Sequence, residues 1–272
     1  MNPKISIVIP TIRENITCLK TIREQTLKIQ QTVVIRNIKP NGRARNLGWH
    51  KAKEEIIIFI DDDAMLAHNK ILANLIDPIL KNQADVVGAS RRLPLDSNWF
   101  ARKAASQIPL IETPIVNQLT ISNPSLIRKN DADKNIWSPV TTTCCAMRRE
   151  VLEKTGGFSE KIQWGVDTEF FYRVRKLGYT FAIAPHTWVY HPYASNIKSL
   201  WRKYFKSGLG TAQEMKLHPQ RKLKPVLKTP LHTLIYLCYR LLVVGALFIV
   251  KPFRAFSVFS STIGYIYGWY SS

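Results

Sequence analysis

Acidic residues are scarce in this chain. Its 272 residues include 19 aspartates and glutamates against 39 lysines and arginines, which gives a formal net charge of +20. Such an excess implies an anionic partner, which can be nucleic acid, an acidic membrane surface or a phosphorylated substrate. Because 46 % of the residues are hydrophobic, the chain is not a disordered protein, and its length suits one α/β domain with an appendage.

Cysteines are few and unpatterned. The four, Cys18, Cys144, Cys145 and Cys238, form neither a Cys-x-x-Cys pair nor a disulfide framework. We therefore expect a reducing compartment and no structural zinc. The apolar stretch 5–9 is too short for a signal peptide and predicts a first strand instead. The sequence also lacks a Gly-x-x-x-x-Gly-Lys-Ser/Thr loop, which excludes a P-loop nucleotidase.

Three consecutive aspartates, Asp61, Asp62 and Asp63, follow the apolar run 56–60. Such a run predicts a strand buried on both faces, and ligands of open α/β sheets bind at the carboxyl ends of strands. Neighbouring carboxylates repel one another unless they share a cation, and hard oxygen ligands suit Mg²⁺ or Mn²⁺. The trio therefore predicts a divalent-metal site that holds a phosphorylated substrate. The alternative is that the aspartates only cap the next helix.

Alternating elements predict a doubly wound sheet, because parallel neighbours need a crossover connection. The expected strands are 5–9, 32–35, 56–60, 84–89, 141–147, 179–184 and 188–191. The expected helices are 15–28, 42–53, 70–81, 149–155 and 167–177. Prolines interrupt every candidate element from 91 to 138, where we expect acceptor-binding loops.

The chain changes character after residue 197. Between 198 and 228, nine lysines and arginines face a single acid, Glu214. The segment 231–250 is almost wholly apolar and has about the ~20 residues that a bilayer span needs. Arg240 near its middle costs ~2.5 to 3.5 kcal/mol on insertion scales, which argues against a clean single span.

These patterns divide the chain into a catalytic domain over 1–197, a basic juxtamembrane segment over 198–228 and membrane-associating helices over 229–272. The last two would form a re-entrant hairpin, or helices lying in the interface, against anionic lipid headgroups. The alternative is a buried helix that completes the core or a dimer interface. Nucleic acid is not expected as the anion, because no recognised nucleic-acid-binding motif is present.

A series of motifs runs along the chain. It comprises Ile5-Ser6-Ile7-Val8-Ile9-Pro10-Thr11 with Glu14, Ala44-Arg45-Asn46-Leu47-Gly48, Phe59-Ile60-Asp61-Asp62-Asp63, Gly156-Gly157-Phe158, Gly165-Val166-Asp167-Thr168-Glu169-Phe170, Pro185 and His191. In order and spacing, over about residues 4 to 192, the series resembles the family 2 glycosyltransferases of the GT-A fold. The resemblance implies a Rossmann-like three-layer αβα sandwich with a mostly parallel mixed sheet, followed by C-terminal hydrophobic helices.

The resemblance also implies the roles of residues at a nucleotide-sugar donor. Asp61 would lie near the ribose or the metal, Asp63 would ligate Mn²⁺ or Mg²⁺ on the diphosphate, and His191 would close the metal shell or touch the diphosphate. The other expected donor-binding residues are Pro10, Thr11, Glu14, Asn37, Arg45 and Asp62. Asn37 stands where the family usually carries an acid near the nucleobase, so the base is not specified.

The resemblance further implies that Asp167 is the general base that deprotonates the acceptor hydroxyl. Trp137 and Trp164 are expected to stack on a sugar face, and Glu169 to bind the acceptor or support Asp167. Structural explanations compete with these roles: a helix cap for Asp167, core packing for the tryptophans and an ordinary polar contact for His191. No Gln-x-x-Arg-Trp motif is present, so transfer of a single sugar is expected.

The sequence thus predicts an inverting, metal-dependent glycosyltransferase that moves one sugar from a nucleotide donor to an acceptor, a lipid-linked glycan, at the cytoplasmic membrane face. Two other classes fit the same sequence. One is a catalytically inactive, membrane-bound partner of another transferase, and the other is a polyanion-binding protein. The sequence makes no prediction of the oligomeric state.

Overall fold

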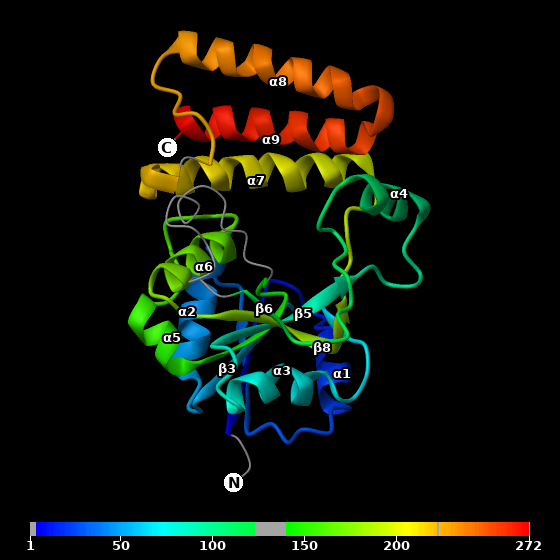
Figure 1. Cartoon of the computed structure of the whole chain (residues 1–272), viewed down its shortest axis with the longest axis vertical. Helices are drawn as coiled ribbons and strands as arrows, with labels where there is room; N and C mark the ends of the chain where they lie inside the picture. The colour runs from blue at the N-terminus through cyan, green and yellow to red at the C-terminus, as the bar shows by residue number, and fades with distance from the viewer. Residues whose placement is uncertain (1–3, 123–139, 222, 272) are drawn as a thin grey trace.

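The computed structural model describes residues 4–122, 140–221 and 223–271. An eight-stranded sheet forms the centre of its larger body (Figure 1). Seven strands follow one another in the order β2 (Gln31–Arg36), β1 (Ile5–Thr11), β3 (Ile56–Ile60), β7 (Cys144–Arg148), β5 (Val86–Arg92), β8 (Phe181–Tyr190) and β4 (Met65–Leu66). The eighth strand, β6 (Thr120–Ser122), pairs with β8.

The sheet is mixed and mostly parallel. Strands β2, β1 and β3 are parallel neighbours, and β5 is parallel to β8. Strand β7 lies between β3 and β5 and is antiparallel to both, so these two groups share one direction. Strands β4 and β6 run antiparallel to β8 at the edge. The predicted mixed α/β fold is therefore confirmed, and β7 is the strand that reverses the chain at the centre.

Helices cover both faces of the sheet, because its inner strand β3 is apolar on both sides. Ile56, Ile58 and Ile60 of β3 pack on one face with helices α1 (Cys18–Arg23) and α3 (Ile71–Leu80). Ile57 and Phe59 pack on the other face with α2 (Asn41–Lys51), α5 (Arg149–Thr155) and α6 (Val166–Lys176). This is the expected three-layer αβα sandwich.

Several elements differ from the sequence prediction. Helix α1 is only six residues long. The two strands expected at 179–184 and 188–191 are one strand, β8, since a register shift between Gly88 and Ser90 of β5 accommodates the residues around Pro185. Helix α4 (Trp99–Gln107) lies in the segment expected to be loops, and the side chain of Asn98 caps its first turn by accepting from Ala101 N at 2.9 Å.

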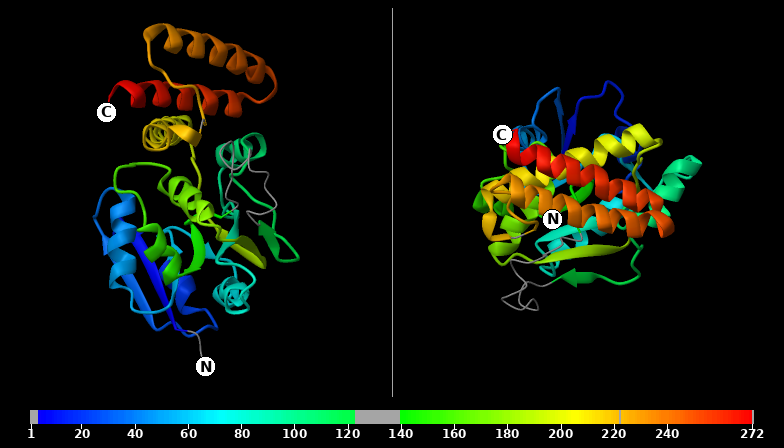
Figure 2. Two further views of the ribbon diagram at one scale, coloured as in Figure 1. Left: turned by 60° about the vertical axis from the view of Figure 1, so that its left-hand side comes forward. Right: turned by 90° about the horizontal axis from the view of Figure 1, so that it is seen from above.

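Three long helices stack in layers beyond the sheet (Figures 1 and 2). Helix α7 (Ile197–Leu217) is nearest the sheet, α9 (Pro252–Tyr270) packs along it, and α8 (Pro230–Val250) is outermost. A capping box between Asn196 and Ser199 starts α7 inside the segment expected to be only a basic linker. A Cβ on Gly208 would overlap the carbonyl oxygen of Ser261, which shows how closely α7 and α9 approach.

Helix α8 differs from the other two in its exposure. It is the one helix in the described part of the chain that is long and apolar enough to cross a membrane, by length and composition. Tyr236 is its single buried residue. Most of its surface therefore faces away from the protein.

Candidate active site

The three aspartates at the end of β3 point in different directions. Asp62 is buried, and its Oδ2 accepts a hydrogen bond of 2.5 Å from Oγ1 of Thr11 at the end of β1. Oδ1 of Asp61 lies 3.0 Å from Nη2 of Arg45 on α2. Oδ2 of Asp63 lies 2.8 Å from Nη2 of Arg13, in the loop after β1. Asp62 thus fixes the turn after β3. Asp61 and Asp63 present their carboxylates at the carboxyl ends of the parallel strands.

His191 comes to the same place from the end of β8. Its Nε2 lies 3.2 Å from Oδ1 of Asp63 and 3.9 Å from Oδ2 of Asp61. The backbone N–H of His191 donates to the carbonyl oxygen of Arg92 at 2.9 Å, which continues the pairing of β8 with β5. Strands β7 and β5 separate β3 from β8 in the sheet, so only the folded chain brings these three side chains together.

Burial and neighbouring charges shift the pKa values of Asp61 and Asp63 in opposite directions. Burial raises the pKa of Asp61, although Arg45 and His191 oppose it. Burial also acts to raise the pKa of Asp63, but the hydrogen bond and charge of His191, together with Arg13, outweigh it and lower that pKa to about 2. Asp63 is therefore held ionised, as a metal ligand must be.

Two carboxylates and an imidazole are ligand types that bind Mn²⁺ or Mg²⁺, so these residues suit a divalent cation in their chemistry. In this structure they contact one another instead: Nε2 of His191 lies 3.2 Å from Oδ1 of Asp63, at hydrogen-bond distance, and 3.9 Å from Oδ2 of Asp61. Within the described residues, no group of three aspartate, glutamate, histidine or cysteine side chains is arranged so that it could hold a metal ion. Bound phosphate oxygens would be needed to finish the coordination shell.

Asp167 lies at the start of α6. Gly165 adopts a left-handed conformation with φ of 75°, which turns the chain into this helix, and Oδ1 of Asp167 accepts from Thr168 N at 3.0 Å. Asp167 is half-buried. Its charge helps to raise the pKa of Asp61. The carboxylate expected to act as base therefore lies within electrostatic reach of the aspartates.

Two cations outside the sequence motifs, Arg91 and Lys203, interact electrostatically with Asp61 and Asp167. Burial lowers the pKa of Arg91 at the end of β5, while the charges of Asp167 and Asp61 oppose this shift. Burial and Arg91 lower the pKa of Lys203 on α7, again against the charges of these aspartates. Arg91 Nη2 donates to Leu110 O at 2.7 Å. Helix α7 thus brings a positive charge to the site, and phosphate oxygens there could accept hydrogen bonds from Lys203.

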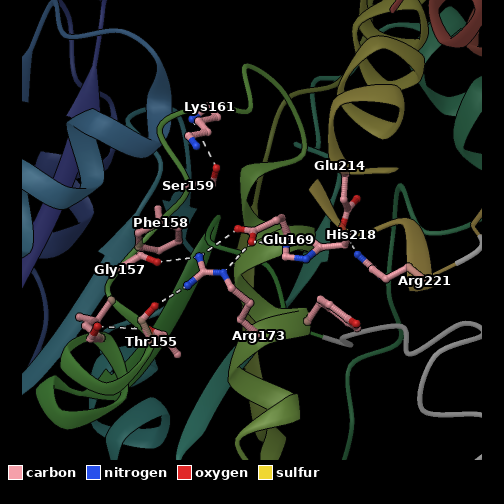
Figure 3. Close-up of polar contacts among 12 residues, drawn as sticks. Thr155, Gly157, Phe158, Ser159, Lys161, Glu169, Arg173, Glu214, His218 and Arg221 are labelled. Atoms are coloured by element: carbon pink, nitrogen blue, oxygen red, sulfur yellow. Dashed lines mark hydrogen bonds and ion pairs between the residues drawn. The ribbon is translucent and has the colours of Figure 1, made fainter. Parts of the chain in front are cut away.

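Glu169, expected at the acceptor, is engaged in a buried network (Figure 3). It is 2 % exposed. Its Oε1 lies 2.6 Å from Nε of Arg173 and 2.9 Å from Nε2 of His218, and its Oε2 lies 2.9 Å from Nη2 of Arg173. Arg173 in turn donates to the carbonyl oxygens of Thr155 and Gly157. The carboxylate of Glu169 therefore joins α6 to the end of α5 and to the residue after α7.

The structure describes four more of the residues expected at the site. Asn37 adopts φ of 58° and donates its backbone N–H to Thr11 O at 2.9 Å, next to the buried Pro10. Glu14 is exposed in the loop after β1. Trp164 is 42 % exposed, and the Nζ of Lys206 on α7 lies 4.0 Å from the centre of its ring. Trp137 lies outside the described residues.

Arg13, Arg91 and His218 are the contributors that the sequence motifs did not identify. Arg13 follows β1 by two residues, and Arg91 lies at the end of β5, so both occupy the strand-end positions where ligands of α/β sheets bind. That position was the available signal. His218 carries no such signal, because its partner Glu169 lies on another helix.

Comparison with known proteins agrees with this geometry. The family model described as Glycosyl transferase family 2 matches residues 19–156. No curated protein matches the chain. The solved structures that share its fold include three with sequence identities of 13 to 16 %.

One is a mannosyltransferase, PcManGT from Pyrobaculum calidifontis, in complex with GDP-Man and Mn²⁺, with 14 % identity, a TM-score of 0.64, and coverage of 100 % of this chain and 88 % of that one. Another is S. aureus TarS 1-349 in complex with UDP-GlcNAc, with 13 % identity, a TM-score of 0.54, and coverage of 97 % and 91 %. A mycobacterial protein has 16 % identity, a TM-score of 0.53, and coverage of 85 % and 81 %.

Proposed function

The chain belongs to glycosyl transferase family 2, and we propose that it transfers a single sugar, with inversion, from a nucleotide-sugar donor to an acceptor hydroxyl. The observation that carries this proposal is the meeting of Asp61, Asp63 and His191 at one edge of the sheet. Displacement at an anomeric carbon needs a leaving nucleoside diphosphate whose charge is neutralised and a nucleophile stripped of its proton. The site offers groups for both tasks.

The donor diphosphate would lie at the carboxylates of β3. Asp61, Asp63 and His191 would hold Mn²⁺ or Mg²⁺, which supplies positive charge to the departing diphosphate. The neighbours solved with GDP-Man and Mn²⁺ and with UDP-GlcNAc support a donor of this class. Arg91 and Lys203 add protein cations that face the same carboxylates, so they would contact phosphate oxygens that the metal leaves free.

Asp167 would take the proton from the acceptor hydroxyl. It lies in the first turn of α6, and Val166 and Phe170 on either side of it pack in the core against the sheet. Its charge acts on Asp61, which is consistent with a base across the sugar from the metal. Attack from that side gives inversion in one step, with the proton moving to an Oδ atom of Asp167.

The acceptor would be a lipid-linked glycan, held at the cytoplasmic face of a membrane. The outermost helix, α8, exposes large apolar side chains including Leu231, Leu242, Phe248 and Ile249. Exposed apolar surface of this kind is typical of proteins that bind a membrane or a partner. A lipid carrier in the same membrane would diffuse in the plane of the enzyme, so its sugar would meet the enzyme more often than a soluble acceptor would.

The test is a screen of nucleotide sugars for Mn²⁺-dependent thermal stabilisation and for transfer. A donor at concentration c stabilises the native state by RT ln(1 + c/Kd), so the melting temperature rises with the donor concentration. Asp63→Ala should lose donor stabilisation, whereas Asp167→Asn should keep it and lose transfer. Asp77→Asn, at an exposed ion pair with Lys81 on α3, is the matched control and should change neither.

Two results would count against this function. If no nucleotide sugar stabilised the protein with Mn²⁺ present, the donor site would be wrong. If a donor bound but Asp167→Asn left the output of the host pathway unchanged, the chain would instead be an inactive partner of another transferase.

A further inference from the structure

The outer helical layer carries positive charge that its own residues do not neutralise. After Glu214 the chain contains no further aspartate or glutamate, although eight lysines and arginines follow. Two of these find partners within the protein. Arg221 pairs with Glu214, and Lys216 Nζ donates to the carbonyl oxygens of Gly268 and Trp269 at 3.0 Å each. Other cations of this layer need a counter-charge from outside the chain.

Lys224 and Arg240 come together at one turn of α9. Nζ of Lys224, in the connection between α7 and α8, lies 3.2 Å from Oγ of Ser261. Nε of Arg240, in the middle of α8, donates to Oγ1 of the next residue, Thr262, at 3.0 Å. Two cations from different segments thus converge on adjacent hydroxyls.

One aromatic ring lies beside each cation. Nζ of Lys224 lies 4.7 Å from the ring centre of Tyr265, and Cζ of Arg240 lies 5.9 Å from that of Tyr236. Burial, reinforced by the charge of Arg240, lowers the pKa of Lys224 to about 7. Among the described residues, no carboxylate contacts either cation. Desolvating a cation that has no charged partner is costly, so an anion bound between the two would be favoured.

The cations lie behind the apolar face of α8. Leu234, Leu241, Leu242 and Ile249 of α8 are exposed, whereas Arg240 turns inward to α9. A helix that lies in a membrane interface buries its apolar face at the acyl boundary, and its cations reach back to the headgroups. The layer between α8 and α9 would then lie at the depth of lipid phosphates.

A crossing orientation fits these contacts poorly. Only Lys251 separates α8 from α9, and α9 packs along α7, which runs across one end of the sheet domain (Figures 1 and 2). To cross a bilayer, α8 would have to leave α9 and take Arg240 away from Thr262 into hydrocarbon. The observed packing instead suits a helix parallel to the membrane surface.

We propose that Lys224 and Arg240 form a site for the phosphate group of an anionic membrane lipid, with α8 lying in the plane of the membrane. This inference rests on the membrane association proposed above. It adds a defined headgroup site that is separate from the donor site. Without such a site, the apolar face of α8 could bind a membrane but would not prefer one lipid headgroup over another.

The first test uses short-chain lipids in solution. Dihexanoyl phosphatidylglycerol should raise the melting temperature of the wild type saturably by several degrees, and dihexanoyl phosphatidylcholine should raise it much less. Lys224→Met should melt higher than the wild type without lipid, because it removes a desolvated cation that has no charged partner, and should lose the response to phosphatidylglycerol. Arg240→Met should lose the response as well.

Lys228→Met is the matched control, since Lys228 is an exposed cation in the same connection. It should respond to lipid as the wild type does. An equal response from Lys224→Met and the wild type would overturn the site. So would stabilisation of the wild type by inorganic phosphate alone to the same extent, because the ligand would then be a soluble anion.

A vesicle flotation assay separates this inference from the proposed membrane association. The wild type should float with phosphatidylcholine vesicles and at least fivefold more with vesicles rich in phosphatidylglycerol. Lys224→Met should keep the first and lose most of the second. If the wild type floated with neither, the membrane association itself would fail. If it floated equally with both, the association would stand and the headgroup site would be wrong.

Discussion

Arg45 and Asp61 form an ion pair of 3.0 Å across the boundary between α2 and the end of β3. Arg45 is 4 % exposed, so its guanidinium depends on this carboxylate for its charge partner, and Phe158 packs against it at 5.7 Å. Such a pair would position Asp61 at the proposed donor site. It also ties the stability of the fold to a residue that the proposed function uses.

Replacing Arg45 with Met should destabilise the protein by about 2 to 4 kcal/mol, because it leaves Asp61 without its main counter-charge. The double variant with Asp61→Asn should recover part of this loss, since both charges are then removed. Urea denaturation of the two single variants and the double variant gives the coupling energy. Additive effects of the two substitutions would show that the pair is not coupled in solution.

Asp63 should make stability depend on pH in the acid range. Its folded pKa is lowered from 3.8 to about 2, so its contribution is fully present above about pH 4 and is lost as the pH falls toward 2. The stability difference between the wild type and Asp63→Asn should therefore shrink by about 2 kcal/mol across that window, in metal-free buffer. Urea unfolding at pH 5 and pH 2.5 measures it. Asp77→Asn, at an exposed site, should show little change with pH.

Glu169→Ala should act on stability. Its carboxylate is buried and satisfies Arg173 and His218, so truncation should cost about 3 to 5 kcal/mol. The expected acceptor role makes a different prediction, a rise in KM for the acceptor at unchanged stability. Unfolding measurements and acceptor kinetics on Glu169→Gln, which keeps the shape of the side chain, distinguish the two roles.

Gly264→Ala should weaken the contact between α9 and α7. A Cβ at this position would overlap the carbonyl oxygen and backbone of Phe205 on α7, so the helices would have to separate. We expect a loss of about 1 to 3 kcal/mol. Gly245→Ala on α8 is the control: nothing lies near its Cβ position, and alanine should stabilise that helix by about 0.5 to 1 kcal/mol. Thermal unfolding that ranks the two variants the other way would contradict the packing of α7 on α9.

The sequence predicted the elements whose signals are local. The apolar run 56–60 became β3 and the segment 149–155 became α5 with the same bounds, because strand hydrophobicity and a Gly-Gly terminus lie within a few residues. The aspartates were placed correctly at a strand end for the same reason. Helix α7 was missed, since its cations obscured its periodicity, although Asn196 and Ser199 formed a recognisable capping box.

Roles that depend on tertiary contacts were not accessible from the sequence. The antiparallel direction of β7 follows from its pairing with β3 and β5, which no local pattern specifies. Glu169 belongs to the acidic motif after Gly165, yet its partner His218 lies beyond α7. In the same way, the position of Arg91 near Asp167 and Asp61 depends on the order of strands in the sheet.

The single residue between α8 and α9 has a geometric consequence for the choice of substrate. Lys251 is the whole connection, α8 packs on α9, and α9 packs on α7, which bears Lys203 near the aspartates, so the three helices form one stack. The height of the reaction centre above any surface on which α8 rests is therefore set by the thickness of three helices. The end of an acceptor glycan tethered to that surface must lie at the height of the reaction centre. Glycans of one length should therefore be extended faster than shorter or longer ones.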